Sequence, residues 1–340
     1  AEIVIEGFVS TESGGPGWEP GGDEPLGPGA CFEGPFGDHT GFYSLPDRYP
    51  IVEVTAITHR RDAVFPATVV GLPPQEDYYL GKATERIFLP LLKTLVPDIE
   101  DYDLPMFGAF HNAAFLQIDK QYPLHARRVM HAIWGAGQMS WTKLVFVVDD
   151  VDPHDTKAVL RAVATRCDPE HDLELVRGPL DILDHAAPGL GVGWKLGFDA
   201  TRRFEGERFS SVESIEATDE AVERCRWVRN VLGVSSPVPG WIFVRVHAEA
   251  RRVANDLLDA VGARPAYVVL LGADVDIEDA DAALFHWCAN MDPGRDLVVR
   301  NGVAVFDATP KTGGTSINGL PVRHWPRVLP TPQQRASGGS

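Results

Sequence analysis

The stretch Glu33-Gly-Pro-Phe-Gly-Asp38-His-Thr-Gly41 combines two carboxylates with three glycines and a proline, and it contains no aliphatic side chain. Glycine adopts backbone conformations that are closed to other residues, and proline fixes its own φ. The pattern therefore predicts a shaped turn rather than a helix or strand. Such a turn can hold two acids at a fixed separation. Carboxylates forced together cannot both ionise freely, so one can stay protonated near neutral pH and donate a proton.

Glu33 and Asp38 are therefore the first candidates for acid–base chemistry, and the adjacent His39 can tune their ionisation. A surface turn with solvated acids fits the same residues, because a short motif specifies little by itself. The rest of the chain has to decide between these two interpretations.

Length, charge and cysteine content narrow the class of protein. The 340 residues suffice for two or three domains with sizeable cores. A formal net charge of −17 disfavours a nucleic-acid or anionic-membrane surface, since both require basic patches. The four cysteines are scattered and form no C-x-x-C pair, which favours reduced thiols and a cytoplasmic location. No run of residues is apolar enough to span a membrane.

The N-terminal part is predicted to be rich in β-structure. Alternating apolar residues predict strands at 2–9, 49–58 and 63–70, the last with Pro66 at an edge or bulge. The Gly- and Pro-rich run at 13–30 predicts a mobile loop. Because the alternation begins at the first residues, the chain is expected to start inside a domain.

The middle of the chain is predicted to alternate helices and strands. Helices are expected at 84–93, despite Pro90, and from Pro123 to about Gly135, with a buried strand at 110–118 between them. These elements precede a segment with a clearer supersecondary pattern.

Lys143-Leu-Val-Phe-Val-Val148 predicts a buried strand, followed by a helix at 155–166 and a strand at 172–176. This order is typical of a βαβ unit, whose parallel strands place functional groups at their carboxyl ends. Asp149-Asp-Val-Asp152 directly follows the first strand. Its acids can bind a metal ion, or they can form the helix N-cap and its neighbours.

The chain also repeats itself at an interval of 124 residues. Ala126-Arg-Arg-Val129 recurs as Ala250-Arg-Arg-Val253. At the same offset, Asp150-Val-Asp152, Asp168-Pro169 and Asp172-Leu173 recur as Asp274-Val-Asp276, Asp292-Pro293 and Asp296-Leu297. Phe198-Asp-Ala-Thr201 returns earlier, as Phe306-Asp-Ala-Thr309, so the first copy carries an extra loop at 178–188. Because only one copy carries the extra loop, we expect one functional copy and one structural or oligomer-forming copy.

Five ordered motifs give the sequence a family likeness. They are Glu33 to Gly41, Thr55-Ala-Ile-Thr-His-Arg-Arg-Asp62, Ala67-Thr-Val-Val-Gly71, Gly178-Pro-Leu-Asp-Ile-Leu-Asp-His185 and Lys195-Leu-Gly-Phe-Asp-Ala-Thr201. In this order they resemble the UbiD decarboxylases. The resemblance covers residues 1 to about 205 closely, and the repeat beyond it resembles the longer members of the family.

The resemblance, together with the predicted elements, implies a mixed α+β and α/β fold. We expect the C-terminal part of a split β-barrel flavin-binding domain at 1–76 and an α/β domain of the UbiD C-terminal type at 77–208. An α/β extension that repeats this domain is expected at 209–330, and a disordered tail at 331–340.

The resemblance also implies a reversible, non-oxidative decarboxylation of an aromatic or α,β-unsaturated carboxylic acid, with a quinone-biosynthesis precursor as the expected substrate. The implied cofactors are prenylated FMN, a divalent metal (Mn or Mg) and K+. Asp38 takes the position of the family's proton donor, and Glu33 that of the acid that pairs with a catalytic arginine. Lys143 matches a family lysine that meets the cofactor phosphate, with a solvated strand end as the alternative.

The sequence departs from the family pattern at one important point. The family's catalytic arginine, and the Asn, His and Glu that hold the metal and flavin phosphate, lie upstream of the acidic turn, in a region absent from this sequence. Arg60 and Arg61 lie downstream and cannot take that role. We therefore expect the later part of a UbiD-like enzyme, either a fragment or one chain of a split pair, completed by an N-terminal half or partner chain.

Family members oligomerise through the C-terminal region, so a homo-oligomer is expected. Two alternatives to the decarboxylase remain. The first is a non-catalytic supporting subunit that completes a partner's flavin site. The second is a metal-dependent hydrolase that uses Asp149, Asp150 and Asp152.

Overall fold

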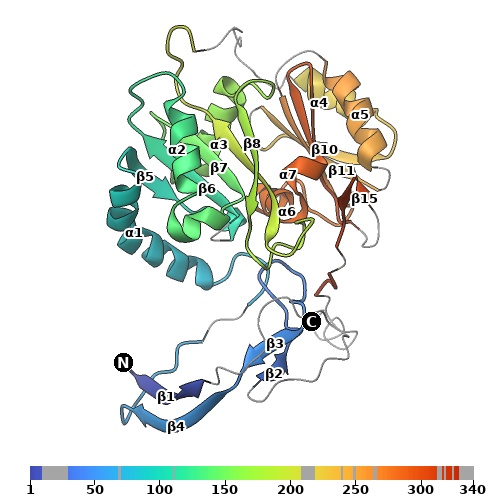
Figure 1. Cartoon of the computed structure of the whole chain (residues 1–340). Coiled ribbons are helices and arrows are strands. Elements are labelled where there is room, and N and C mark those ends of the chain that lie inside the picture. The colour runs from blue at the N-terminus through green and yellow to red at the C-terminus, as the bar shows by residue number, and fades with distance from the viewer. Residues whose placement is uncertain are drawn as a thin grey trace. The chain divides into compact units, whose positions relative to one another are not determined.

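A computed structural model describes residues 1–9, 30–67, 70–109, 112–207, 219–238, 240–247, 250–262, 266–311, 316–317, 319–323 and 325–328. The chain divides into two compact units, a smaller one of residues 1–76 and 325–340 and a larger one of residues 77–324 (Figure 1). The loop predicted at 13–30 and the tail predicted at 331–340 lie outside the described residues, apart from Ala30.

The smaller unit contains two antiparallel ribbons. β1 (Ile3–Val9) pairs with β4 (Val52–His59), and β2 (Ala30–Glu33) pairs with β3 (Asp47–Pro50). The strand predicted at 49–58 is thus divided between β3 and β4. The strand predicted from residue 63 is wrong for residues 63–67, which form no strand, and Pro66 lacks the N–H that a ladder needs. The split barrel itself stays a prediction.

The larger unit contains two five-stranded sheets with the same pattern of pairing. The first has the order β5-β6-β7-β9-β8, with strands Ile99–Asp103, Ala113–Ile118, Leu144–Val148, Val192–Asp199 and Leu173–Pro179. The second has the order β10-β11-β12-β14-β13, with strands Val231–Ser235, Trp241–Val246, Ala266–Leu271, Val303–Ala308 and Leu297–Arg300. In each sheet three central parallel strands lie between two antiparallel edge strands.

Helices cover both faces of both sheets, which confirms the predicted α/β architecture (Figure 1). α1 (Asp77–Leu95) and α2 (His125–Ile133) pack on the outer face of the first sheet. α4 (Asp219–Arg226) and α5 (Ala250–Val261) pack on the outer face of the second. α3 (Thr156–Arg166) and α6 (Ala280–Asn290) lie in the core between the sheets. The shorter elements are η1 (Met106–Gly108), η2 (Gly137–Trp141), α7 (Pro293–Asp296), β15 (Ser316–Ile317) and β16 (Leu320–Pro321).

The core between the sheets is aromatic and continuous. Phe146 stacks on Phe198 with ring centroids 4.4 Å apart, and Trp241 stacks on Tyr267 at 4.6 Å. The ring of Trp287, from α6, lies 5.0 Å from that of Trp241. Because these side chains are fully buried, the two copies share one hydrophobic core.

Two local predictions differ from the structure. Pro123 does not open α2, because Leu124 adopts a left-handed φ of 61° and the helix begins at His125. The strand after α3 was expected to complete a parallel βαβ unit, but β8 pairs antiparallel with β9, and β9 lies parallel to β7. Periodicity identifies a strand but does not choose its partner.

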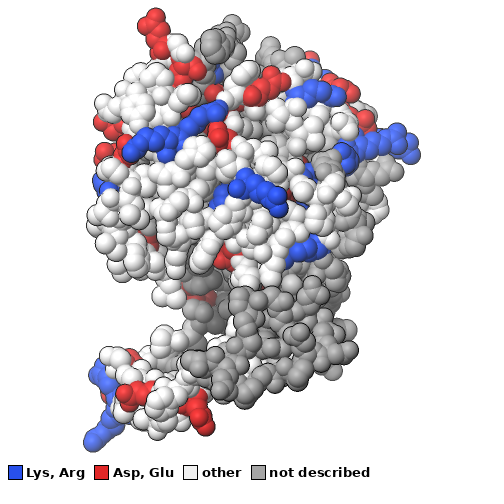
Figure 2. Space-filling model, viewed as in Figure 1, with Lys and Arg blue, Asp and Glu red and all other residues white. Residues whose placement is uncertain are grey.

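The surface carries no concentrated basic region on the face drawn in Figure 2, where Lys and Arg are scattered in small groups. In the part of the chain that is described, no helix combines the length and apolarity needed to cross a membrane.

Candidate active site

The acidic stretch forms the predicted turn in the smaller unit. Glu33 ends β2, and Gly34 then turns the backbone with a φ of 90°. Ser44 fastens the turn, because its hydroxyl accepts from the Phe36 N–H at 3.1 Å and its own N–H donates to the Phe36 carbonyl at 2.8 Å. Gly41 also has a positive φ, of 79°. Gly34 and Gly41 therefore adopt backbone conformations that favour glycine, as the predicted turn requires.

Asp38 is buried within this turn, with 7% of its surface exposed. Its Oδ1 accepts from the His39 N–H at 2.7 Å and lies 2.6 Å from His39 Nδ1. His39 is therefore in direct contact with Asp38, and its influence on the ionisation of the acid stays a prediction. Because the backbone N–H and the Nδ1 atom of His39 both contact the same oxygen, the carboxyl group of Asp38 is held in one orientation.

Glu33 differs from Asp38 in its surroundings, because its side chain is exposed. The expectation that the two carboxylates are forced together stays a prediction. Within the turn, Asp38 is the acid that is shielded from water.

Lys143 lies in the larger unit and is fully buried. Its Nζ lies 2.8 Å from Asp184 Oδ2 and donates to the Met291 carbonyl at 3.1 Å. It is not the solvated strand end that was considered as the alternative. A contact with a cofactor phosphate stays a prediction, and this geometry already pairs the lysine charge with a carboxylate.

Sequence reasoning missed the polar cluster that surrounds this pair. His185 Nε2 lies 3.0 Å from Asn290 Oδ1, and burial lowers the pKa of His185 to about 4. Asp292 accepts from the Trp194 N–H at 2.9 Å, and burial raises the pKa of Asp292 to about 6. The available signal was the motif at 178–185, which was interpreted as a family marker and not as a contact between the copies.

The acids after β7 are neutralised by arginines. Asp149 Oδ2 accepts from Arg202 Nε at 2.9 Å, and a hydrogen bond from Arg166 holds the pKa of Asp150 below its usual value. Asp155 Oδ1 accepts from the Ala158 N–H at 3.0 Å and caps α3. The cap of α3 is therefore Asp155, which lies outside the cluster at 149–152, while Asp149 and Asp150 are paired with arginines. Neither the capping interpretation of that cluster nor the metal-dependent hydrolase gains support from these contacts.

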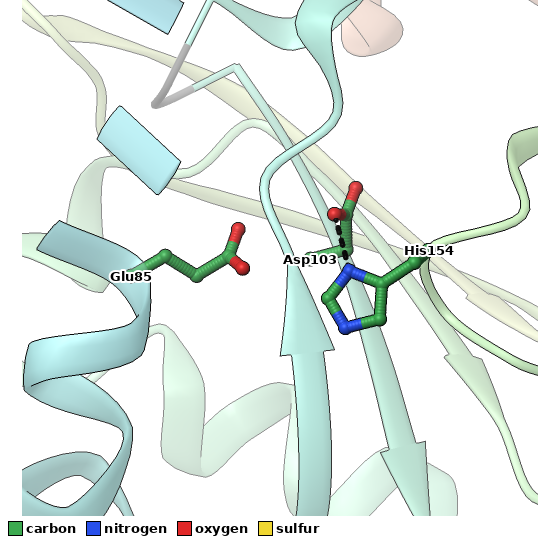
Figure 3. A group of neighbouring side chains, drawn as sticks. All are labelled: Glu85, Asp103 and His154. Carbon is green, nitrogen blue, oxygen red and sulfur yellow. Dashed lines mark hydrogen bonds and ion pairs between the residues drawn. The ribbon is translucent and has the colours of Figure 1, made fainter. Parts of the chain in front are cut away.

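A second group of possible metal ligands was not predicted. Donor atoms of Glu85, Asp103 and His154 all lie within 4.8 Å of one another, and His154 Nδ1 is 2.9 Å from Asp103 Oδ1 (Figure 3). They come from α1, the end of β5 and the loop after β7. Carboxylate and imidazole groups are suitable ligands for a divalent ion.

The charge of this group is nevertheless already balanced within the protein. Lys82 Nζ donates to Glu85 Oε2 at 2.9 Å and also contacts Asp103 Oδ1. The ammonium occupies the place of a cation, so the residues as arranged do not fit a divalent metal, and we derive no step through one.

Comparison with known proteins gives matches along most of the chain. A family model described as the 3-octaprenyl-4-hydroxybenzoate carboxy-lyase Rift-related domain matches residues 1–73. A model described as the C-terminal domain of the same carboxy-lyase matches at 78–200 and again at 207–318. The two matches of the second model fall on the two sheets of the larger unit.

Individual relatives are longer than this chain. An uncharacterized protein of Archaeoglobus fulgidus is 47% identical over 211 residues, which are 62% of this chain and 40% of the relative. An uncharacterized protein of Aquifex aeolicus is 45% identical over 237 residues, 69% of this chain and 46% of the relative. The chain thus spans less than half the length of these relatives.

A solved structure has a similar fold. The vanillic acid decarboxylase (ShVdcCD) of Sedimentibacter hydroxybenzoicus, in closed form, is 24% identical, with 66% of this chain and 45% of that chain covered and a TM-score of 0.51. This likeness concerns the fold. Because the two family models together match most of its residues, the protein belongs to the UbiD family.

Proposed function

We propose that this protein contributes the proton donor of a carboxy-lyase that reversibly and non-oxidatively decarboxylates an aromatic or α,β-unsaturated carboxylic acid. A quinone-biosynthesis precursor is the proposed substrate class. The observation that carries the proposal is the burial of Asp38 beside His39, in the turn whose motif matches the family's acid positions. The vanillic acid decarboxylase with the similar fold acts on an aromatic acid, but its likeness concerns the fold, and the quinone-precursor class follows from the family resemblance alone.

In the proposed reaction Asp38 holds a proton and delivers it to the carbon atom that CO2 leaves. The backbone N–H and the Nδ1 atom of His39 both contact Asp38 Oδ1, so the carboxyl group is oriented before substrate binds. Positioned acids of this kind typically contribute factors of about 10²–10⁴ to the rate. The adjacent imidazole can restore the proton after each turnover.

The proposed cofactors are prenylated FMN, a divalent metal (Mn or Mg) and K+. Prenylated FMN, if bound in the complete enzyme, would supply an electron sink for the decarboxylation. The pairing of Lys143 with Asp184 and the position of Lys82 within the Glu85 group do not fit these cofactors. We therefore propose that the ligands of the metal and phosphate, and the arginine partner of Glu33, come from an N-terminal half or partner chain.

The cellular setting is proposed to be cytoplasmic, with a homo-oligomeric enzyme. The four cysteines are free, Cys31 exposed and the other three buried, which is consistent with a reducing compartment. The buried thiol of Cys288 has its pKa raised to about 12 by burial, so it is unreactive.

The test is the variant Asp38→Asn in the complete, flavin-loaded enzyme. We expect turnover to fall at least ~100-fold while the flavin absorption spectrum is retained, because the amide cannot donate the proton. Asp62→Asn is the matched control, since Asp62 is an exposed acid of the same unit and its loss should leave turnover unchanged. Full activity of Asp38→Asn would remove the assignment.

The alternative is a supporting subunit that completes a partner's flavin site, and it is motivated by the short span of this chain relative to its relatives. Supplying the purified chain with prenylated FMN separates the two roles. Decarboxylation by the chain alone excludes a purely supporting role. Activity that appears only with a co-purified partner, and that survives Asp38→Asn, supports it.

A further inference from the structure

A cavity of about 380 Å³ opens at one edge of the second sheet. It is lined by β10, by the end of β11 and by the loop after β12, and these strands are neighbours in the second sheet. β10 and β11 are labelled in Figure 1. The site therefore lies at the carboxyl ends of the parallel strands β11 and β12, where open α/β sheets place their ligands. Its volume is at the lower end of the range for small-molecule sites, about 300–1,000 Å³.

Arg245 on β11 gives this cavity an unmet hydrogen-bonding requirement. Its Nε is buried and, among the residues that the structure describes, has no hydrogen-bond partner. The guanidinium is always charged, and a buried N–H without an acceptor is costly. A carboxylate offers two oxygens in the geometry that a guanidinium recognises.

The first copy shows how the equivalent edge is filled. Asp101 pairs across the strands with Gln117, as Gly233 pairs with Arg245, and both edge strands have an irregular register at that point. The Asp101 carboxylate accepts from Arg86 at 2.7 Å. At Gly233 no side chain occupies this position, and a Cβ there would lie 3.6 Å from a terminal nitrogen of Arg245. At this pair of positions the second copy thus has the Arg245 guanidinium and no carboxylate. The first copy has the Asp101 carboxylate, which accepts a hydrogen bond from Arg86.

The lining of the cavity also contains acidic residues. Asp276 and Glu278 line it, and Glu278 Oε2 accepts from the Ser235 hydroxyl at 3.1 Å. Glu278 stands 124 residues after His154, which contacts Asp103 in the first copy. These carboxylates can accept a hydrogen bond from a ligand hydroxyl.

The charges and apolar walls restrict the ligand further. Arg226 Nη1 lies 3.4 Å from Glu223 Oε2, and Asp276 and Glu278 offset the charge of Arg245, so a polyanion would not be favoured over a ligand with one negative charge. Apolar side chains, including Ile277, also line the cavity.

We infer that this cavity binds a small monocarboxylate that also carries a hydroxyl group. Its carboxylate pairs with Arg245, its hydroxyl donates to Asp276 or Glu278, and its apolar body contacts Ile277. The site belongs to the second copy and includes none of the residues of the proposed decarboxylation. The inference therefore does not depend on that function.

The experiment is calorimetric titration of the chain with para-hydroxyphenylacetate. The carboxyl group of this probe is on a saturated carbon, so it is not a substrate of the proposed reaction. We expect saturable binding that is at least ~10-fold weaker in Arg245→Gln, which places the amide of the first copy at this position. Gly233→Asp should weaken binding similarly, because its carboxylate would occupy Arg245.

Controls separate specific binding from general charge effects. Arg300→Gln changes an arginine of the same sheet whose partner is the exposed Asp259, and it should bind as the unmodified chain does. The methyl ester of the probe should not bind, and phenylacetate should bind more weakly because it lacks the hydroxyl. Thermal melting verifies that each variant is folded, and Gly233→Asp provides the test if Arg245→Gln is not. Absence of saturable binding, equal affinity in Gly233→Asp, or equal loss in Arg300→Gln would overturn the inference.

Discussion

The two sheets of the larger unit have the same strand order but close one edge differently. In the second sheet, β13 and β14 are joined by Asn301 and Gly302, whose φ values of 54° and 77° suit a two-residue hairpin. In the first sheet, β8 and β9 are separated by residues 180–191. The extra loop predicted for the first copy is therefore present in the structure.

Both copies share a hydrogen bond between an aspartate side chain and the backbone N–H of an aspartate four residues earlier. The Asp168 N–H donates to Asp172 Oδ2 at 2.7 Å, and the Asp292 N–H donates to Asp296 Oδ2 at 2.8 Å. These hydrogen bonds fix the chain as it leaves the central helices. The motifs that recur at 124 residues thus mark the same local geometry in each copy.

The differing loop connects the copies. Asp184 pairs with Lys143, its backbone carbonyl accepts from Arg323 at 2.6 Å, and the next residue, His185, contacts Asn290. The loop of the first copy therefore sits on residues of the second. The comparison indicates that the extra loop of the first copy connects the two halves of the core.

The largest expected effect on stability comes from removing the ion pair between Asp184 and Lys143. Asp184→Asn leaves the Lys143 ammonium buried without its counter-ion, and we expect a loss of about 3–5 kcal/mol in the free energy of unfolding, measured by urea denaturation. The double variant Lys143→Met with Asp184→Leu removes both charges and should lose less. If the double variant is as unstable as the single one, the charge is not the cause.

A smaller effect is expected where the copies pack against each other. A Cβ at Gly294 would lie 2.2 Å from the ring of Trp194, whereas the first copy has the exposed Glu170 at this position. Gly294→Ala should lower the free energy of unfolding by about 1–3 kcal/mol through overpacking. Glu170→Ala should change it by less than about 0.5 kcal/mol, and Trp194→Leu should partly rescue Gly294→Ala. Equal effects at 170 and 294 would contradict this difference between the copies.

The smallest effect should be the same in both copies. Asp155 caps α3 by accepting from the Ala158 N–H, and Asp279 caps α6 by accepting from the Asp281 and Ala282 N–H groups. Asp155→Ala and Asp279→Ala should each cost about 1 kcal/mol in unfolding free energy. A difference much larger than this between the two variants would show that the caps are not equivalent.

Much of the local structure could be predicted from the residues alone. The apolar run after Lys143 identified β7, the predicted helix at 155–166 corresponds to α3, and the recurring motifs located the corresponding elements of the second sheet. For the candidate site, the spacing of Gly and Pro predicted the turn that holds Asp38. These features succeed because they depend on residues that are close together in the sequence.

The sequence by itself determined the family, the repeated elements and the identity of the acidic turn, since these are local patterns of residue types. Tertiary structure alone decided that β8 pairs antiparallel with β9, that Asp38 is buried while Glu33 is exposed, and that Lys143 meets Asp184. The physical reason is that strand partners, burial and ion pairs depend on residues far apart in the chain. Periodicity carries no information about which of them will meet.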